Sequence, residues 1–379
     1  MLTRDQRRPR NLRRRTASLV SVLGVCVAIL AGCSAAPAAP SAAPASPAPA
    51  ASPAASPSAT ASASGQVCAD KKVALVTTQR TGDQGVVDDM VSNGADKAKT
   101  ELGAQTTVIE ALDSAAYVAQ LTNLANAGFN VIATNFNPMT DPLKQVAPKF
   151  PNVHFIQIYG DPLTPTIPNL RTVSYRYDEA TYLSGILAAT ITKTGILAFE
   201  AGLFGPAINT DYWAFRQGAM SVNPNITILA AAVGSFTDEA KAKEVVSALF
   251  AQGADVVQQD GPIVGLIQAA LDKQKYAIIG SETLSTMAPE WVVGVTFIRF
   301  GESLFHEIAA ACQDSFQGGH SRSGVKDGIT GLYVPDTFLQ SGDPSVLEKV
   351  KAVLPAIEEA QADIASGSLV IAVNQEQPQ

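Results

Sequence analysis

Apolar runs and amphipathic segments alternate along the chain from residue 71 onward. The first apolar run, 71–77, is followed by a segment of helical periodicity at 87–102. Further strand-like runs lie at 106–111, 131–134, 153–159, 195–200, 226–233, 255–259 and 276–280. Helical segments follow most of them, at 115–127, 142–150, 210–222, 238–252 and 263–273. Parallel strands need a crossover that is usually a helix, so this alternation predicts an α/β fold with parallel sheets.

The segment from Arg171 to Ala189 divides this alternation into two halves. Its first part is rich in β-branched and aromatic residues, which favours a strand. From Asp178, which we predict to be a helix N-cap, apolar residues recur at helical spacing. We therefore expect a strand to be followed directly by a helix here, where the chain crosses from one lobe to another.

Two further crossings are expected later in the chain. Strand-like runs at 291–300 and 328–334 precede helical segments at 302–315 and 344–364. Three crossing strands between two doubly wound lobes form the layout of a type I periplasmic binding protein. On this layout lobe one comprises 67–177 with 298–328, and lobe two comprises 178–297 with 329–373.

Residues 1–33 have the composition of an export signal. Arginines precede an apolar run from Leu19 to Leu30, and small residues lead to Cys33. The run is too short to span a bilayer as a helix, and this order is typical of a secretory signal. The residues before Cys33 resemble a bacterial lipobox, in which the cysteine is lipid-modified. A buried helix with an incidental cysteine is the alternative, and the cluster at 13–15 fits a twin-arginine route poorly.

The segment 34–66 is predicted to be a linker. Every residue from Ser34 to Ser64 is Ala, Pro or Ser except Thr60. Such a composition does not bury a core, and its prolines favour an extended spacer. At roughly 3.1 Å per residue, the spacer would reach up to about 100 Å from a lipid anchor.

The processed chain is acidic. Its formal charge is −7 over 379 residues, and loss of residues 1–32 removes seven arginines and one aspartate, which leaves −13. This charge disfavours nucleic acid and an anionic membrane surface as partners. Membrane association would then come through the lipid on Cys33.

Two of the four cysteines remain after processing and lipidation, namely Cys68 and Cys312. The predicted layout places both in lobe one. An oxidising extracytoplasmic compartment favours a disulfide between them. Two unpaired thiols are the alternative.

Ligands in open α/β sheets bind beyond the carboxyl ends of the strands, so the candidate site lies between the facing strand ends of two lobes. The candidates at these positions are Asp83, Asn135, Phe136, Tyr159, Phe204, Asp260 and Glu282. We expect Phe136 and Phe204 to sandwich a ring, and Asp83 and Glu282 to accept hydrogen bonds from hydroxyls. The alternative is that the rings belong to the core and the acids to solvated loops.

The sequence contains no recognisable catalytic constellation. Its three histidines, at 154, 306 and 320, are too scattered to suggest a metal site or a triad. It has no G-x-S-x-G motif and no P-loop, and the turn at 202–205 lacks the dinucleotide fingerprint. We therefore expect a binding protein rather than an enzyme, with no metal and no cofactor.

Several short motifs follow one another in a specific order. They lie at 176–185, 215–218, 233–238, 252–255, 325–328 and 364–367. Together they resemble the basic membrane protein family of bacterial lipoproteins, the nucleoside-binding components of ABC importers. The similarity runs from about Val73 to Ile371. It implies a two-lobed protein that captures a small solute and delivers it to an ABC permease.

The ligand-facing motifs differ from those of the family's nucleoside binders. The acidic, aromatic loop after the first strand is replaced by Gly82–Asp89, in which Asp83 retains the acid. Glu282 stands where an aspartate would hold ribose hydroxyls, and Tyr159 stands where an aspartate is common. The lysine expected near 296–299 has no clear counterpart.

The sequence therefore predicts a monomeric, lipid-anchored, extracytoplasmic solute-binding protein of an ABC importer. Its expected ligand is a nucleoside or a similar small polar metabolite. A sensory receptor lipoprotein for a different small molecule is the alternative, and the sequence does not separate the two. A repressor of the same two-lobe type is excluded, because an export signal replaces the DNA-binding headpiece.

Overall fold

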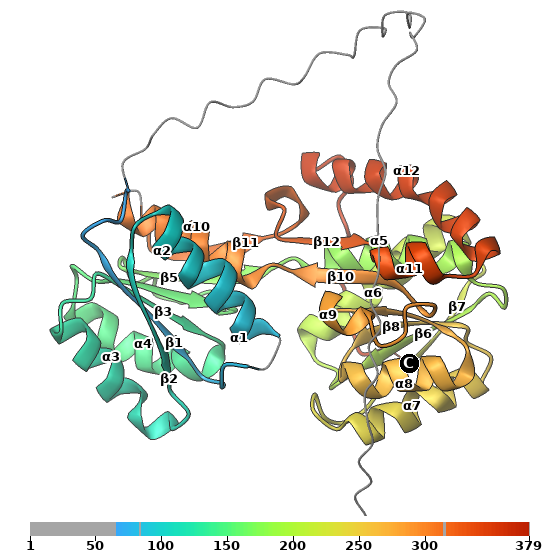
Figure 1. The fold of residues 1–379 in the computed structure, drawn as a ribbon, viewed down its shortest axis with the longest axis horizontal. Helices are drawn as coiled ribbons and strands as arrows, with labels where there is room; N and C mark the ends of the chain where they lie inside the picture. Colours follow the sequence, from blue (N-terminus) through green and yellow to red (C-terminus); the bar gives the residue numbers. More distant parts are fainter. Residues whose placement is uncertain (1–65, 83–84, 314–315, 379) are drawn as a thin grey trace, which may run out of the picture. The chain divides into compact units, whose positions relative to one another are not determined.

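The computed structural model describes residues 66–82, 85–313 and 316–378. They form two six-stranded sheets with helices on both faces (Figure 1). None of the helices within these ranges combines the length and the apolar character needed to cross a membrane. The predicted signal peptide, Cys33, the linker up to residue 65 and Asp83 lie outside the described residues.

The first sheet, with its helices, is called lobe one. Its strands are parallel in the order β11-β5-β4-β3-β1-β2. They are β1 Lys72–Thr77, β2 Gln105–Glu110, β3 Val131–Asn135, β4 His154–Ile158, β5 Leu170–Tyr175 and β11 Gly319–Ser323. The helices are α1 Val86–Asp89, a π-helical stretch Met90–Asp96, α2 Lys97–Glu101, α3 Tyr117–Asn126, α4 Thr140–Val146 and α10 Phe300–Cys312. Single 3₁₀ turns lie at Ser114–Ala116, Asn137–Met139 and Ala147–Lys149, and a fourth, Val325–Asp327, lies in the connection from β11 to β12.

The second sheet, with its helices, is called lobe two. Its strand order is β12-β10-β9-β8-β6-β7, parallel except for the antiparallel pair β10–β12. The strands are β6 Ile196–Ala201, β7 Thr227–Ala232, β8 Val256–Asp260, β9 Tyr276–Ile279, β10 Val292–Ile298 and β12 Thr330–Tyr333. The helices are α5 Tyr177–Ile191, α6 Pro206–Val222, α7 Glu239–Ala251, α8 Ile263–Lys273, α9 Glu282–Ser285, α11 Asp336–Ser341 and α12 Pro344–Ser366. The predicted architecture of two parallel-sheet α/β lobes is confirmed.

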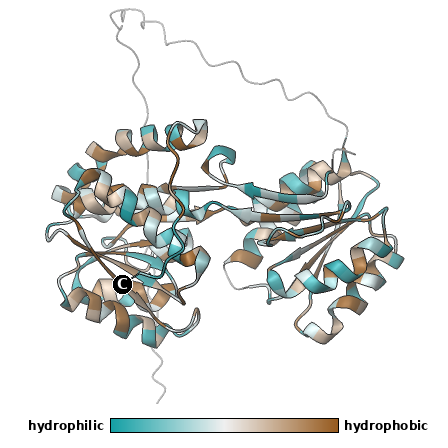
Figure 2. Cartoon of the chain, turned by 180° about the vertical axis from the view of Figure 1, so that it is seen from behind, coloured by the Kyte–Doolittle hydropathy of each residue, from teal (hydrophilic) through white to brown (hydrophobic). Residues whose placement is uncertain are grey.

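The inner strands are largely apolar and almost entirely buried, because helices cover both of their faces, and their polar residues gather toward the carboxyl ends. All five residues of β3 and all four of β9 are buried. Figure 2 shows the contrast between largely hydrophobic strands and helices of mixed hydropathy. Burial of each large side chain, such as Phe155 in lobe one or Phe199 in lobe two, contributes about 1.5–3 kcal/mol.

Two predicted helix starts were wrong. Helix α5 begins at Tyr177 with Arg176 as its N-cap residue, so Asp178 lies inside the first turn. The Asp178 carboxylate accepts hydrogen bonds from the Arg176 guanidinium, at 2.8 to 3.1 Å, rather than from a helix N–H group. Helix α6 begins at Pro206, four residues before the predicted 210, because proline is favoured at the first helical position.

Three chain segments connect the lobes, and hydrogen bonds join them to one another. The first links β5 to α5, the second links β10 to α10, and the third links β11 to β12. The Arg176 N–H donates to Ser323 O, which joins the first and third connections. The Arg299 N–H donates to Ile329 O, which joins the second and third. These bonds fix the three connections as one unit.

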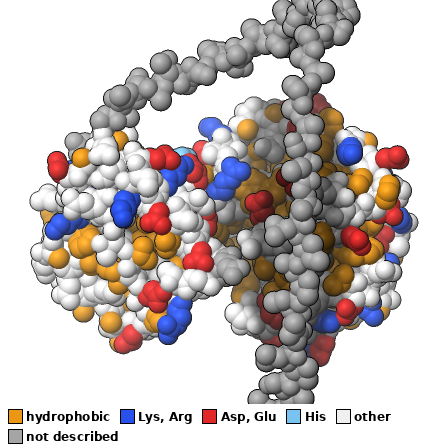
Figure 3. All heavy atoms as spheres, viewed as in Figure 1, with side chains coloured by type: hydrophobic (Ala, Val, Ile, Leu, Met, Phe, Trp, Pro, Cys, Tyr) orange, Lys and Arg blue, Asp and Glu red, His pale blue; other side chains and the backbone are white. Residues whose placement is uncertain are grey.

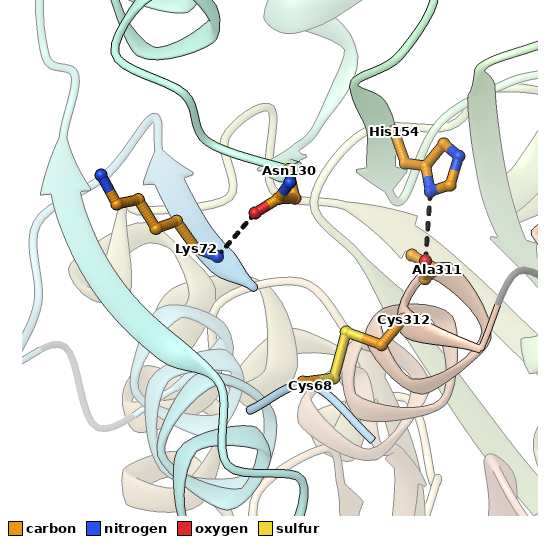
Figure 4. Close-up of a disulfide and its surroundings, with 6 residues drawn as sticks. All are labelled: Cys68, Lys72, Asn130, His154, Ala311 and Cys312. Atoms are coloured by element: carbon orange, nitrogen blue, oxygen red, sulfur yellow. Dashed lines mark hydrogen bonds between the residues drawn. A yellow bond between two sulfur atoms is a disulfide. The ribbon is translucent and has the colours of Figure 1, made fainter. Parts of the chain in front are cut away.

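A disulfide joins Cys68 to Cys312 within lobe one (Figure 4). It fastens the turn before β1 to the last residue of α10, although 244 positions separate the two cysteines. Beside it, His154 Nδ1 lies 3.2 Å from Ala311 O, and the His154 ring stacks on Phe316. His154 therefore has a structural role next to the end of α10.

Candidate ligand-binding site

Each sheet has one point where the strand order reverses. It lies between β1 and β3 in lobe one, and between β6 and β8 in lobe two. Ligands in open α/β sheets bind at the carboxyl ends of the strands beside this point. Asn135 ends β3 and Asp260 ends β8, so these two predicted residues occupy equivalent positions in the two lobes.

The Asn135 side chain is fully buried and only partly satisfied. Its Oδ1 accepts hydrogen bonds from the Thr78 backbone N–H, at 2.9 Å, and from the Thr78 hydroxyl, at 3.3 Å. Its Nδ2 is buried and has no partner among the described residues. A buried donor without a partner costs about 1–3 kcal/mol, so this N–H group is suited to a ligand acceptor.

Aromatic rings form a wall beside Asn135. Phe136 and Tyr159 follow directly after β3 and β4, and their ring centroids are 5.7 Å apart. Tyr159 also lies about 6 Å from the rings of Tyr175 and Phe300. Phe136 and Tyr159 have φ values of 61° and 57°, a left-handed conformation that costs non-glycine residues of order 1 kcal/mol or more. This backbone turns both rings toward the strand ends.

Two carboxyl groups of lobe two face this wall. Burial is the main cause that raises the pKa of Asp260 to about 7, and burial with the neighbouring Asp260 charge raises the pKa of Asp211 well above its ordinary value. The pair therefore retains a proton near neutral pH and can both donate and accept hydrogen bonds. No described lysine, arginine or histidine forms a salt bridge with either group.

The carboxyl groups of Asp211 and Asp260 in lobe two affect the pKa of Tyr159 in lobe one. Burial, followed by the negative charges of Asp260, Asp211 and Asp161, raises the pKa of Tyr159 to about 12. The residue as a whole nevertheless remains 41% exposed, and it lies in the wall of a cavity.

A cavity of about 490 Å³ lies next to these groups, within the size range of small-molecule sites. Both lobes and the connections between them contribute to its wall: Tyr159, Gly160, Asp161, Pro162, Ser174, Tyr175, Tyr177, Asp178, Pro206, Ala207, Thr210, Asp211, Ile298, His320, Arg322, Val373 and Gln375. Among them, Asp178 is already paired with Arg176 and lies 3.5 Å from Arg322. Asp161, the other acid of the wall, is exposed and accepts a hydrogen bond of 3.1 Å from Asn137 Nδ2. Asp211, with Asp260 as its neighbour behind the wall, is thus the buried acid of the wall that has no salt-bridge partner among the described residues.

His320 lies in the same wall as a neutral hydrogen-bonding group. Its Nδ1 and Nε2 are each 2.9 Å from a hydroxyl, those of Thr172 and Ser174. Burial lowers its pKa. On the face drawn in Figure 3, the Lys and Arg side chains of the described residues are scattered among acidic ones. The cavity wall contains three aspartates and one arginine, Arg322, so a small polar solute suits it better than a polyanion.

Of the predicted residues that the structure describes, Tyr159 alone is in the cavity wall. Asn135, Phe136 and Asp260 lie at the strand ends, outside the wall, and Phe204 and Glu282 lie elsewhere. Phe204 is partly buried and packs against the core of lobe two. Glu282 is exposed at the start of α9, and Tyr333, on β12, has a pKa raised by burial and by Glu282. Neither residue lines the cavity.

Sequence reasoning missed Phe236, Asp211 and the residues near the C-terminus. Phe236 follows β7 and is 52% exposed. Its ring covers Gly202 so closely that a Cβ there would lie 2.3 Å from Phe236 Cδ1. The motif at 233–238 contains Phe236, so it was the sequence signal that could have identified this ring. No sequence signal identified Asp211, because its position depends on the early start of α6.

The two lobes, with three connections between them, have the fold of the type I periplasmic binding proteins. A solute-binding protein of an ABC transporter system from Aeropyrum pernix superposes with a TM-score of 0.65, over 81% of this chain and 94% of that chain, at 19% identity. A family model described as "ABC transporter substrate-binding protein PnrA-like" matches residues 71–363. The chain belongs to this family, and the resemblance to the basic membrane proteins is confirmed.

Two relatives illustrate the family. Basic membrane protein A2 of Borrelia garinii is 27% identical over 249 residues, which are 63% of this chain and 73% of the relative. A purine-binding protein of Brucella abortus is 27% identical over 281 residues, 72% of this chain and 76% of the relative. The protein is therefore an extracytoplasmic substrate-binding protein of the ABC transporter type.

Proposed function

We propose that this protein captures a nucleoside, with a purine nucleoside preferred, for uptake through an ABC permease. The observation that carries the proposal is the arrangement of Tyr159 and Phe136 opposite the Asp211–Asp260 pair. An aromatic face and a carboxyl pair match the two halves of a nucleoside, a planar base and a sugar with vicinal hydroxyls. The purine-binding relative from Brucella abortus supports the same class of ligand.

Each half of the ligand has defined partners in this proposal. The base stacks on the rings after β3 and β4, and Phe236 of lobe two closes over its other face. The free Asn135 N–H donates to an acceptor on the base, and the Asp211–Asp260 pair accepts from the ribose hydroxyls. Stacking at about 1–3 kcal/mol and charged hydrogen bonds at about 1.5–3 kcal/mol each are sufficient for micromolar binding, about 8 kcal/mol.

The proposal includes the mode of attachment. Lipid on Cys33 would hold the protein at the membrane, and the segment 34–66 would give the monomeric domain its reach to the permease. The small residues before Cys33 support this part. The substitution Cys33→Ala is expected to move the protein from the membrane fraction to the medium or periplasm, which fractionation of expressing cells would detect. Retention in the membrane would contradict lipid anchoring.

Thermal denaturation with a panel of solutes tests the ligand. Purine nucleosides at 1 mM are expected to raise the Tm by several degrees, because a ligand at about 1,000 times a micromolar Kd adds about 4.1 kcal/mol. Pyrimidine nucleosides, free bases, D-ribose and amino acids serve as comparisons. Stabilisation by a different class with none by any nucleoside would overturn the proposal.

A further inference from the structure

The last residues of the chain are fastened along one face of α6. Asn209, Trp213 and Gln217 are spaced four residues apart and so lie on the same face of the helix. Each donates a side-chain hydrogen bond of 2.8 Å to a backbone carbonyl of the C-terminal segment: Asn209 to Gln375, Trp213 to Glu376 and Gln217 to Ala372. Three helix side chains thus hold the segment's backbone.

Further contacts fix where this segment begins. Ile371 is 3% exposed and belongs to the core of lobe two. The Ala372 N–H also donates to Gln217 Oε1, so Gln217 binds both backbone groups of Ala372. The chain is therefore held at Ile371 and Ala372 before it runs along α6.

The attachment brings two side chains to the ligand cavity. Val373 and Gln375 form part of its wall, next to Pro206, Thr210 and Asp211 from the first turns of α6. Val373 is 55% exposed although it is apolar. The segment binds α6 through the backbone carbonyls of Gln375 and Glu376, so these bonds do not occupy the Gln375 side-chain amide.

We propose that the segment 371–376 is a wall of the solute site and that Gln375 is a specificity-determining residue that contacts the bound solute. This inference rests on the proposed function of the cavity. An amide supplies both a donor and an acceptor, so Gln375 would recognise a polar edge of the ligand beside Thr210 and Asp211, while Val373 would cover an apolar part. Because α6 fixes the backbone in advance, little ordering remains when the ligand binds.

The test compares Gln375→Ala with Gln377→Ala, which removes the same side chain two residues further on, outside the cavity wall. Affinities of the purified chains are measured by isothermal titration calorimetry with the nucleosides, bases, sugars and amino acids of the panel. For the solute that the unmodified chain binds most tightly, Gln375→Ala is expected to weaken binding at least tenfold, and Gln377→Ala less than twofold. Equal affinities of the two variants and the unmodified chain would overturn the proposal.

Truncation provides a second measurement. A chain that ends at Ala372 keeps the buried Ile371 and is expected to lose affinity at least as much as Gln375→Ala. Its Tm in the absence of solute should fall only by the loss of the hydrogen bonds from Asn209 and Trp213. Truncation that leaves affinity intact would also overturn the proposal. If the preferred solute is not a nucleoside, the proposed function fails, but the same comparison of variants still decides the role of Gln375.

Trp213→Phe tests the attachment of the segment 371–376 to α6 separately from the contact of Gln375 with the solute. It removes the indole N–H that holds Glu376 and retains an aromatic ring on α6. We expect a faster dissociation of solute and an affinity between those of the unmodified chain and Gln375→Ala. An affinity equal to that of the unmodified chain would contradict a positioning role for Trp213.

Discussion

The Glu179 carboxylate accepts a hydrogen bond of 2.8 Å from the backbone N–H of Val325, which lies 146 residues further along the chain. Its other oxygen is 3.2 Å from the Arg176 guanidinium. Glu179 is 7% exposed and lies in the first turn of α5, whereas Val325 belongs to the connection between β11 and β12. One buried side chain therefore ties the first connection between the lobes to the third.

Replacement of Glu179 by alanine is expected to lower the free energy of unfolding by about 2–3 kcal/mol. The change leaves the buried Val325 N–H without a partner and removes an anion from beside Arg176. Urea unfolding followed by circular dichroism measures the effect. Glu244→Ala, which breaks the exposed pair with Lys241, is the matched control and is expected to leave the midpoint unchanged. A urea midpoint for Glu179→Ala equal to that of the unmodified chain would contradict the role of Glu179 in joining the two connections.

Loss of the Cys68–Cys312 disulfide is expected to destabilise the chain by about 2–5 kcal/mol, since the bond closes a long loop and constrains the unfolded state. Urea unfolding with and without dithiothreitol measures the difference. The double variant Cys68→Ala, Cys312→Ala should unfold at the lower midpoint under both conditions. A response of the double variant to the reductant would show that another group is responsible.

The inner strands could be predicted from the sequence because burial on both faces leaves a largely apolar run. The edge strand β11, Gly319–Ser323, was not predicted, since its residues are polar and its place depends on pairing with β5. The polar character reflects its position at the edge of the sheet. Local pattern thus predicted the centre of each sheet and missed one edge.

The candidate site likewise contains residues that could be predicted from the sequence and residues that could not. Asn135 and Asp260 were accessible to sequence reasoning because each ends a strand beside the point where the strand order reverses. Gln375 was not, because 166 residues separate it from Asn209, the helix residue that binds its carbonyl. Such a contact follows from the packing of the last segment on α6 and leaves no periodic signal in the sequence.

The two phenylalanines of lobe two near the strand ends are expected to respond differently to truncation. Phe236→Ala should weaken nucleoside binding roughly tenfold, the loss of about 1–3 kcal/mol of stacking, and leave the Tm nearly unchanged because the ring is half exposed. Phe204→Ala should retain affinity and lower the stability instead, because Phe204 packs against the core. Calorimetric titration and thermal denaturation of both variants separate these effects. The reverse pattern would restore Phe204 as the stacking ring.

The raised pKa of Asp260 predicts that stability decreases as the pH rises from about 4 to about 7. The unfolded chain releases this proton near pH 4, whereas the folded chain retains it up to about pH 7, so the folded state binds more protons across this window. Asp260→Asn cannot ionise and is expected to be more stable than the unmodified chain at pH 8, by on the order of 2–4 kcal/mol, with a smaller difference at pH 4.

Urea unfolding at pH 4, 6 and 8 measures this dependence for both chains. Part of the slope should persist in Asp260→Asn, because burial also raises the pKa of Glu200 to about 8 and that of Asp211. The Asp260 charge contributes to both shifts, so its removal should also move the remaining slope toward lower pH. Parallel stability curves for the two chains from pH 4 to 8 would show that Asp260 has the same pKa in the folded and the unfolded chain, and Asp260 would then hold no proton for a ligand near neutral pH.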